Sequence, residues 1–241
     1  MMRLPARLTA QLAKARIARI FKSAAVYSLI HCVDSAEILH PGSGAPVSHE
    51  RMQRLVETSS PVIWIGGSEP LVHPGIGHFV RAIAQKDRFV FLETNGALLR
   101  RRIHEFQPLP GLFLVVRLDE LPGPESELAL EGLRAARLSG FFTVIHSVVR
   151  ENPGLAGLGA IRSFILRNDL DGWLMTAESA DQGIVRKAAE ARRFISSLFW
   201  RQFSKQIEQA ILTGTKRREV TGTPPADESD AETKEASVKV A

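Results

Sequence analysis

With 241 residues, of which 44% are hydrophobic, the chain is long enough to bury one sizeable core, which favours one domain with terminal extensions. The formal net charge of +5 gathers in residues 3–22 and in Lys216–Arg218, and this distribution does not favour nucleic acid as a partner. A single cysteine, Cys32, excludes an intramolecular disulfide framework, and no apolar run reaches the roughly 20 residues that span a bilayer, so we expect a cytoplasmic protein.

The first segment, residues 1–23, is predicted to be a basic amphipathic helix. It has no acidic residue up to Phe21, and Leu4, Leu8 and Leu12 recur at helical spacing. We expect its apolar face to pack across one end of the core with its charges in solvent. The alternatives are peripheral contact with an anionic membrane, a targeting segment and a helix that binds a partner.

Strand-like and helix-like segments then alternate through residues 24–180, the predicted barrel domain. Short apolar runs predict buried strands at 24–32, 61–67, 88–96, 111–119, 141–149 and 172–177. Helices are predicted between them at 48–57, 75–85, 97–106, 126–140 and 159–168. This alternation implies parallel pairing through right-handed crossovers, and hence the α/β class. Beyond the barrel we predict one long amphipathic helix over 181–213 and a disordered tail over 214–241.

Two turns at the ends of predicted strands are candidates for ligand contact. One strand runs into Gly66 and Gly67, where glycine allows positive φ and lets a ligand approach main-chain groups. The next strand ends in Thr94, Asn95 and Gly96. Because the carboxyl ends of successive parallel strands share one rim, we expect the two turns to lie together. The alternative is a tight connection in which the following glutamate only caps a helix.

The two turns resemble motifs of the radical S-adenosylmethionine family, in which the second strand ends in a GGEP-like motif and the third often ends in TNG. The matching residues are Gly66, Gly67, Glu69, Pro70, Leu71, His73, Pro74, Thr94, Asn95 and Gly96, and Ser68 interrupts the GGEP pattern. The resemblance covers residues 26–177 and implies a partial (β/α)6 TIM-like barrel. It also implies that S-adenosylmethionine binds at Gly66, Gly67, Glu69, Pro70, Thr94 and Asn95. Asp119, Ser147 and Asn152 are weaker candidates for ribose or adenine contacts.

The chemistry of that family requires a [4Fe–4S] cluster held by three thiolates, usually in a CxxxCxxC motif after the first strand. Cys32 falls at the first of these positions and is the candidate metal ligand, but Ala36 and Leu39 occupy the other two. Nearby His31, Asp34, Glu37 and His40 follow no defensible ligand spacing. We therefore expect the cluster chemistry to be lost or impaired.

Three hypotheses remain open for the function. The first is a degenerate barrel that binds S-adenosylmethionine or a related nucleotide, or only a partner, without radical chemistry. The second is an active enzyme whose unusual cluster is assembled with non-cysteine ligands or with a partner subunit. The third is a different α/β protein, either binding or hydrolytic, or a scaffold that meets a partner or a membrane through its terminal helices. A nucleophile elbow, a phosphate-binding loop and an HExxH pair are absent from the sequence, and Glu93 is a candidate acid or base beside the predicted site.

Overall fold

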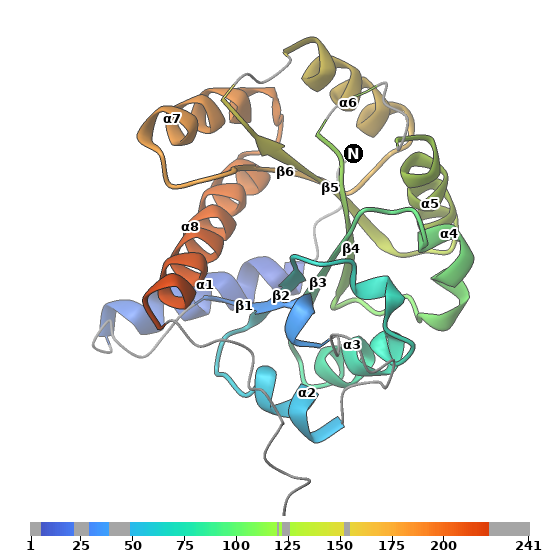
Figure 1. The fold of residues 1–241 in the computed structure, drawn as a ribbon, viewed down its shortest axis with the longest axis vertical. Coiled ribbons are helices and arrows are strands. Elements are labelled where there is room, and N and C mark those ends of the chain that lie inside the picture. Colours follow the sequence, from blue (N-terminus) through green and yellow to red (C-terminus); the bar gives the residue numbers. More distant parts are fainter. Residues whose placement is uncertain are drawn as a thin grey trace, which may run out of the picture.

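A computed structural model describes residues 6–21, 29–38, 49–119, 121, 126–151 and 155–221. At its centre is a six-stranded sheet in which all neighbouring strands are parallel and follow one another in chain order. The strands are β1 (Ile30–Asp34), β2 (Val62–Gly66), β3 (Phe89–Thr94), β4 (Leu112–Arg117), β5 (Phe142–Val149) and β6 (Gly172–Ala177). Because every crossover advances the sheet in one direction and the strands twist, the sheet curls into the half-barrel of Figure 1. The predicted partial (β/α)6 barrel is confirmed.

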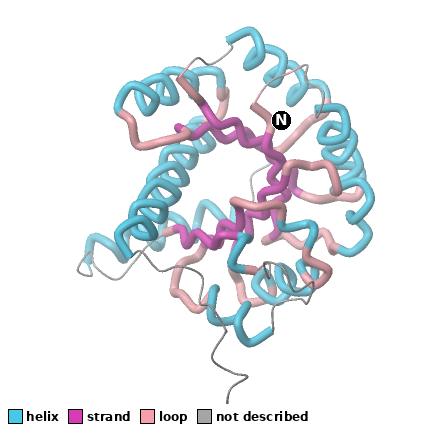
Figure 2. Tube along the Cα trace, in the orientation of Figure 1, coloured by secondary structure: helices cyan, strands magenta, loops and turns pink. Residues whose placement is uncertain are grey.

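Helices cover the convex face of the sheet, as Figure 2 shows. They are α2 (His49–Leu55), α3 (Ile76–Ala84), α4 (Leu99–Arg102), α5 (Ser126–Leu138), α6 (Leu155–Arg167) and α7 (Gln182–Ala191). Short 3-10 turns lie at η1 (Ser35–Glu37), η2 (Pro70–Val72), η3 (Ile103–Glu105) and η4 (Arg192–Phe194). The helices cover the outer face of the sheet, and side chains in the barrel interior cover its inner face. The strands are therefore buried on both faces, which explains their continuous apolar sequences.

The last helix, α8 (Leu198–Thr221), crosses the open side of the half-barrel between β6 and β1 (Figure 1). Trp200 and Phe203 reach the interior from α8 and are fully buried. Phe203 lies 5.1 Å from Phe91, which in turn stacks on Phe113 with ring centroids 4.4 Å apart. A side chain at Gly172 would overlap the indole of Trp200. Aromatic packing therefore fills the half of the interior near the amino ends of the strands.

The prediction of a single helix over 181–213 is wrong, because the chain breaks between α7 and α8. Arg192, in η4, turns inward and donates to the carbonyl oxygen of Met175. Ile195 follows in an extended, fully buried conformation, and α8 begins only after it. No glycine or proline marks this break in the sequence. The break redirects the chain across the barrel.

Several other boundaries differ from the sequence prediction; for example, α6 begins at Leu155 rather than near Gly159, and α4 ends at Arg102 rather than at Phe106. Strand β1 ends at Asp34, two residues later than predicted, and residues 22–28 lie outside the described part. Helix α8 extends to Thr221, so residues 214–221 are helical rather than disordered. The remaining predicted tail, 222–241, lies outside the described residues.

The N-terminal helix α1 (Ala6–Phe21) packs through its first turns, with Leu8 and Leu12 buried. Arg7 forms a 2.5 Å ion pair with Asp87, and Gln11 donates to the Asp87 carbonyl oxygen at 3.1 Å. Within the described residues, no helix combines the length and apolar character needed to cross a membrane. Peripheral membrane contact through α1 stays a prediction.

Candidate functional site

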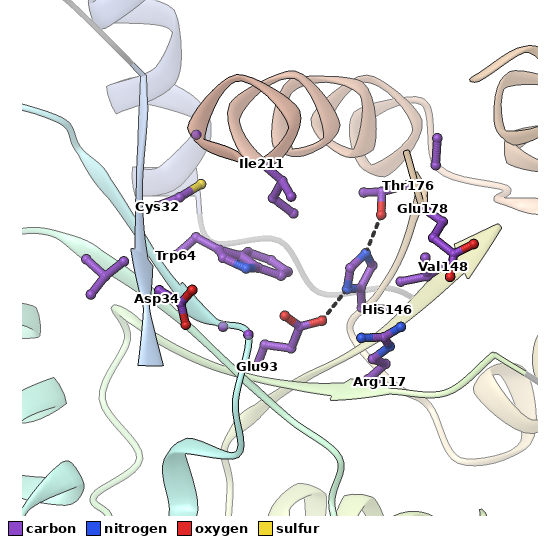
Figure 3. Close-up of a pocket in the computed structure, with 15 residues that line it drawn as sticks. Cys32, Asp34, Trp64, Glu93, Arg117, His146, Val148, Thr176, Glu178 and Ile211 are labelled. Atoms are coloured by element: carbon purple, nitrogen blue, oxygen red, sulfur yellow. Dashed lines mark hydrogen bonds and ion pairs between the residues drawn. The ribbon is translucent and has the colours of Figure 1, made fainter. Parts of the chain in front are cut away.

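A pocket of about 340 Å³ opens inside the half-barrel at the carboxyl ends of the strands. All six strands or the residues that follow them contribute to its wall, and α8 closes one side (Figure 3). The lining side chains that bear on its chemistry are Cys32, Asp34, Trp64, Glu93, Arg117, His146, Thr176, Glu178 and Ile211. Ligands of open α/β folds bind at this end of the strands, so the pocket is the candidate site.

The glycine pair after β2 forms part of the pocket wall. A Cβ on Gly66 would overlap the Glu93 carboxylate and lie 2.7 Å from Trp64 Nε1. Gly67 has φ of +103°, and a Cβ there would lie 2.5 Å from Asp34 Oδ1. Glycine is thus required at both positions because two carboxylates approach the turn.

Glu69, by contrast, is engaged by the protein itself. Its Oε1 accepts hydrogen bonds from the Leu71 amide at 3.0 Å and from Thr94 Oγ1 at 2.7 Å, while Oε2 accepts from the Asn95 amide at 2.8 Å. Pro70 follows at the start of η2 and is buried. The structure therefore brings Glu69, Pro70, Thr94 and Asn95 together, but these residues tie the two turns to each other and do not line the pocket.

Asp119 also lies outside the pocket wall. Its Oδ1 accepts a 2.8 Å hydrogen bond from the Val148 amide, and its Oδ2 lies 3.5 Å from Arg150. The Ser147 hydroxyl donates to the Leu118 carbonyl oxygen at 2.7 Å. Both side chains join the ends of β4 and β5, whereas Asn152 lies outside the described residues.

A row of three polar side chains forms the centre of the pocket wall and was not predicted as a unit. His146 Nδ1 lies 2.5 Å from Glu93 Oε1, and His146 Nε2 lies 2.8 Å from Thr176 Oγ1 (Figure 3). The side chain of His146 is 3% exposed and that of Glu93 is 12% exposed. Trp64 meets the imidazole edge-on, with ring centroids 5.3 Å apart. The row therefore joins β3, β5 and β6 across the barrel interior.

The carboxyl group of Glu93 is ionised in this setting. Burial by itself raises its pKa, but the charge of His146 and the hydrogen bond from that imidazole outweigh burial. The charge of Arg117 and a hydrogen bond from Trp64 act in the same direction, so the pKa of Glu93 lies below its ordinary value. An ionised carboxylate only accepts hydrogen bonds, so the contact with Glu93 requires a proton on His146 Nδ1. Nε2 donates to Thr176 Oγ1 in the imidazolium and accepts from it in the neutral imidazole.

The sequence identified Glu93 in this row but not its partners. His146 interrupts an apolar strand and is separated from Glu93 by 53 residues. A polar residue inside an otherwise apolar buried strand was the signal that could have found it, since buried polar groups need partners.

Cys32 lies within β1, opposite Trp64 in the strand register, and is half-buried in the pocket wall. A three-thiolate cluster does not fit here, because this is the one cysteine of the chain and Ala36 lies in η1 where a second ligand is needed. His31 is turned to the carbonyl oxygen of Leu55 at 2.8 Å. Within the described part of the chain, no three His, Cys, Asp or Glu side chains are placed to hold a metal ion, while Leu39 and His40 lie outside that part.

No family profile and no curated protein matches this sequence. Among solved structures, the chain is similar to TYW1 with a bound lysine–pyruvate adduct, at 15% identity and a TM-score of 0.43, over 60% of this chain and 53% of that one. It is also similar to an archaeal TYW1, at 17% identity and a TM-score of 0.42, over 65% of this chain and 59% of that one. The chain thus spans little more than half the length of either protein, and no activity follows from these similarities.

Proposed function

We propose that this chain is a radical-S-adenosylmethionine-like protein that binds S-adenosylmethionine, or a related cationic nucleoside, without three-thiolate cluster chemistry. The observation that carries the proposal is the position of the glycine pair. Gly66 and Gly67, which carry the sequence resemblance, lie in the wall of the pocket between the carboxylates of Asp34 and Glu93. A ligand in the pocket meets both the turn and the acidic side chains.

The charge of the pocket wall supports a cationic ligand. Asp34, Glu93 and Glu178 contribute three carboxylates to the wall, and Arg117 contributes one guanidinium. Glu93 is paired with His146, and Glu178 with Arg150 at 3.0 Å. S-adenosylmethionine carries a positive sulfonium and a positive amino group beside one carboxylate. Its net positive charge complements this lining, and the pocket has the size of a small-molecule site.

Isothermal titration with S-adenosylmethionine and S-adenosylhomocysteine tests the proposal, because the second compound lacks the sulfonium charge. We expect S-adenosylmethionine to bind about tenfold more tightly, as one added charge contact predicts. Asp34→Asn keeps the size of the side chain and should remove most of that preference. Asp87→Asn, on the surface beside α1, is the matched control and should leave it intact. Failure of both compounds to bind would overturn the proposal.

A separate measurement tests the absence of cluster chemistry. Anaerobic reconstitution with iron and sulfide should leave no stoichiometric iron on the protein. About four irons per chain, lost in Cys32→Ala and accompanied by 5′-deoxyadenosine formation on reduction, would instead establish an active enzyme with unconventional ligands.

A further inference from the structure

The side chains of Thr176, His146 and Glu93 lie in the order of a nucleophile triad. Glu93 Oε1 lies 2.5 Å from His146 Nδ1, and Thr176 Oγ1 lies 2.8 Å from His146 Nε2. In the neutral imidazole that carries its proton on Nδ1, Nε2 accepts the hydroxyl proton of Thr176. A hydroxyl, an imidazole and a carboxylate in this order define a nucleophile, a base and the group that orients the base. The arrangement is recognised by geometry and does not require a particular sequence motif.

All three residues face the pocket rather than a closed core. Each of them lines the 340 Å³ cavity, and Arg117 lines it as well (Figure 3). Its positive charge lowers the pKa of Glu93, so the guanidinium is the group in this wall that can stabilise a negative charge formed in the pocket. A ligand in the pocket can therefore meet nucleophile, base and cation together.

We propose that Thr176, His146 and Glu93 form a hydrolytic site that cleaves small carboxylic esters. Thr176 Oγ1 attacks the ester carbonyl carbon while His146 Nε2 takes the hydroxyl proton, and the carbonyl oxygen becomes an oxyanion that faces Arg117. Collapse expels the alcohol, which receives the proton from His146, and leaves the acyl group on Thr176. Water then gives a proton to His146 and attacks the acyl group, which releases the acid and returns the proton to Thr176.

The lining also limits the class of ester. Asp34, Glu93 and Glu178 repel an anionic substrate, so the acyl group and the alcohol should be neutral or cationic. The cavity volume restricts the substrate to a small molecule. This site does not depend on S-adenosylmethionine binding, because hydrolysis uses no cofactor.

Release of p-nitrophenolate from p-nitrophenyl acetate by the full chain tests the proposal, with mass mapping of the acetylated residue. We expect Thr176→Val and His146→Gln to lower kcat/KM by about a hundredfold, the scale of general-base catalysis. Thr176→Ser should retain activity, because it keeps the hydroxyl group. Its comparison with Thr176→Val tests whether the loss of activity in Thr176→Val comes from the missing hydroxyl or from a disturbed structure. Glu93→Gln, at the positioning residue, should lower kcat and leave KM unchanged.

Cys32→Ala removes a competing nucleophile, since this thiol lines the same pocket and reacts readily with activated esters. Acetyl mapped to Thr176 in the Cys32→Ala protein supports the relay. Acetyl mapped to Cys32, unchanged turnover in Thr176→Val, or no turnover by the folded wild type would each overturn it. An equal rate with the anionic p-nitrophenyl succinate would overturn the assigned substrate class.

Discussion

Glu208 joins α8 to the barrel, and its replacement should destabilise the folded protein. Its Oε2 accepts a 2.6 Å hydrogen bond from the Ala177 amide and pairs with the guanidinium of Arg192. The side chains of Glu208 and Arg192 are only 5% and 8% exposed, so water cannot replace either partner. Glu208→Ala leaves a buried guanidinium and a buried amide without this acceptor. We expect a loss of about 3–5 kcal/mol in the free energy of unfolding.

Urea denaturation followed by circular dichroism measures this loss. Glu208→Gln keeps an acceptor for the Ala177 amide and should lose about 1–3 kcal/mol. The double variant Arg192→Met with Glu208→Leu removes both charges, and should be more stable than Glu208→Ala because no charge is left buried alone. A loss below about 1 kcal/mol for Glu208→Ala, or strictly additive effects in the pair, would refute the anchoring role.

Four further outcomes follow from the packing and charge of the described residues. Gly172→Ala places a Cβ 2.5 Å from the Trp200 ring and should lower the unfolding free energy in urea by about 1–3 kcal/mol; no change would mean that α8 packs elsewhere. Leu8→Ala should lower the unfolding free energy by about 2–5 kcal/mol in the same assay, because Leu8 is buried in the core. An unchanged unfolding free energy would mean that α1 does not pack against the core. The side chain introduced by Gly214→Leu would enter open space at the pocket wall without disturbing the fold. It should weaken the binding of S-adenosylmethionine measured by calorimetry, and an unchanged affinity would contradict binding in this pocket. The lowered pKa of Glu93 means that its stabilising effect is present above the ordinary glutamate pKa of about 4.3 and is lost as the pH falls through the native value. The stability difference between wild type and Glu93→Gln, measured by urea titration across acidic pH, should therefore shrink as the pH falls below the ordinary glutamate pKa.

The barrel could be predicted from the sequence because its strands are buried on both faces. Such strands appear as unbroken apolar runs, and alternation with helices fixes parallel pairing in chain order. The break between α7 and α8 could not be predicted, because no glycine or proline marks it. It depends instead on Arg192 reaching Met175 and Glu208, contacts that exist only after folding.

The site was predicted in part, and the limit has a physical reason. Gly66 and Gly67 reach the pocket, as expected from glycines that follow a strand. The carboxylate oxygens of Glu69 could accept hydrogen bonds either from a ligand or from the neighbouring turn, and the sequence alone does not distinguish these two roles. In the structure Thr94 and Asn95 occupy both oxygens. The partners of Glu93 were missed because they lie on distant strands that only the curl of the sheet brings together.

The interior of the half-barrel is divided between two kinds of packing, and the division bears on where chemistry belongs. Phe113 lies near the amino end of β4. Together with Trp200 and Phe203 from α8, it fills that half of the interior with aromatic rings. The other half holds Glu93 and His146 beside an open pocket. Buried, hydrogen-bonded polar groups such as these seldom stabilise a fold more than apolar residues of similar volume, and this chain already fills the adjoining half with apolar residues. Stability alone therefore does not account for the polar half, and ligand chemistry is to be sought there rather than in the loop after β1, where the thiolates of a cluster are lacking.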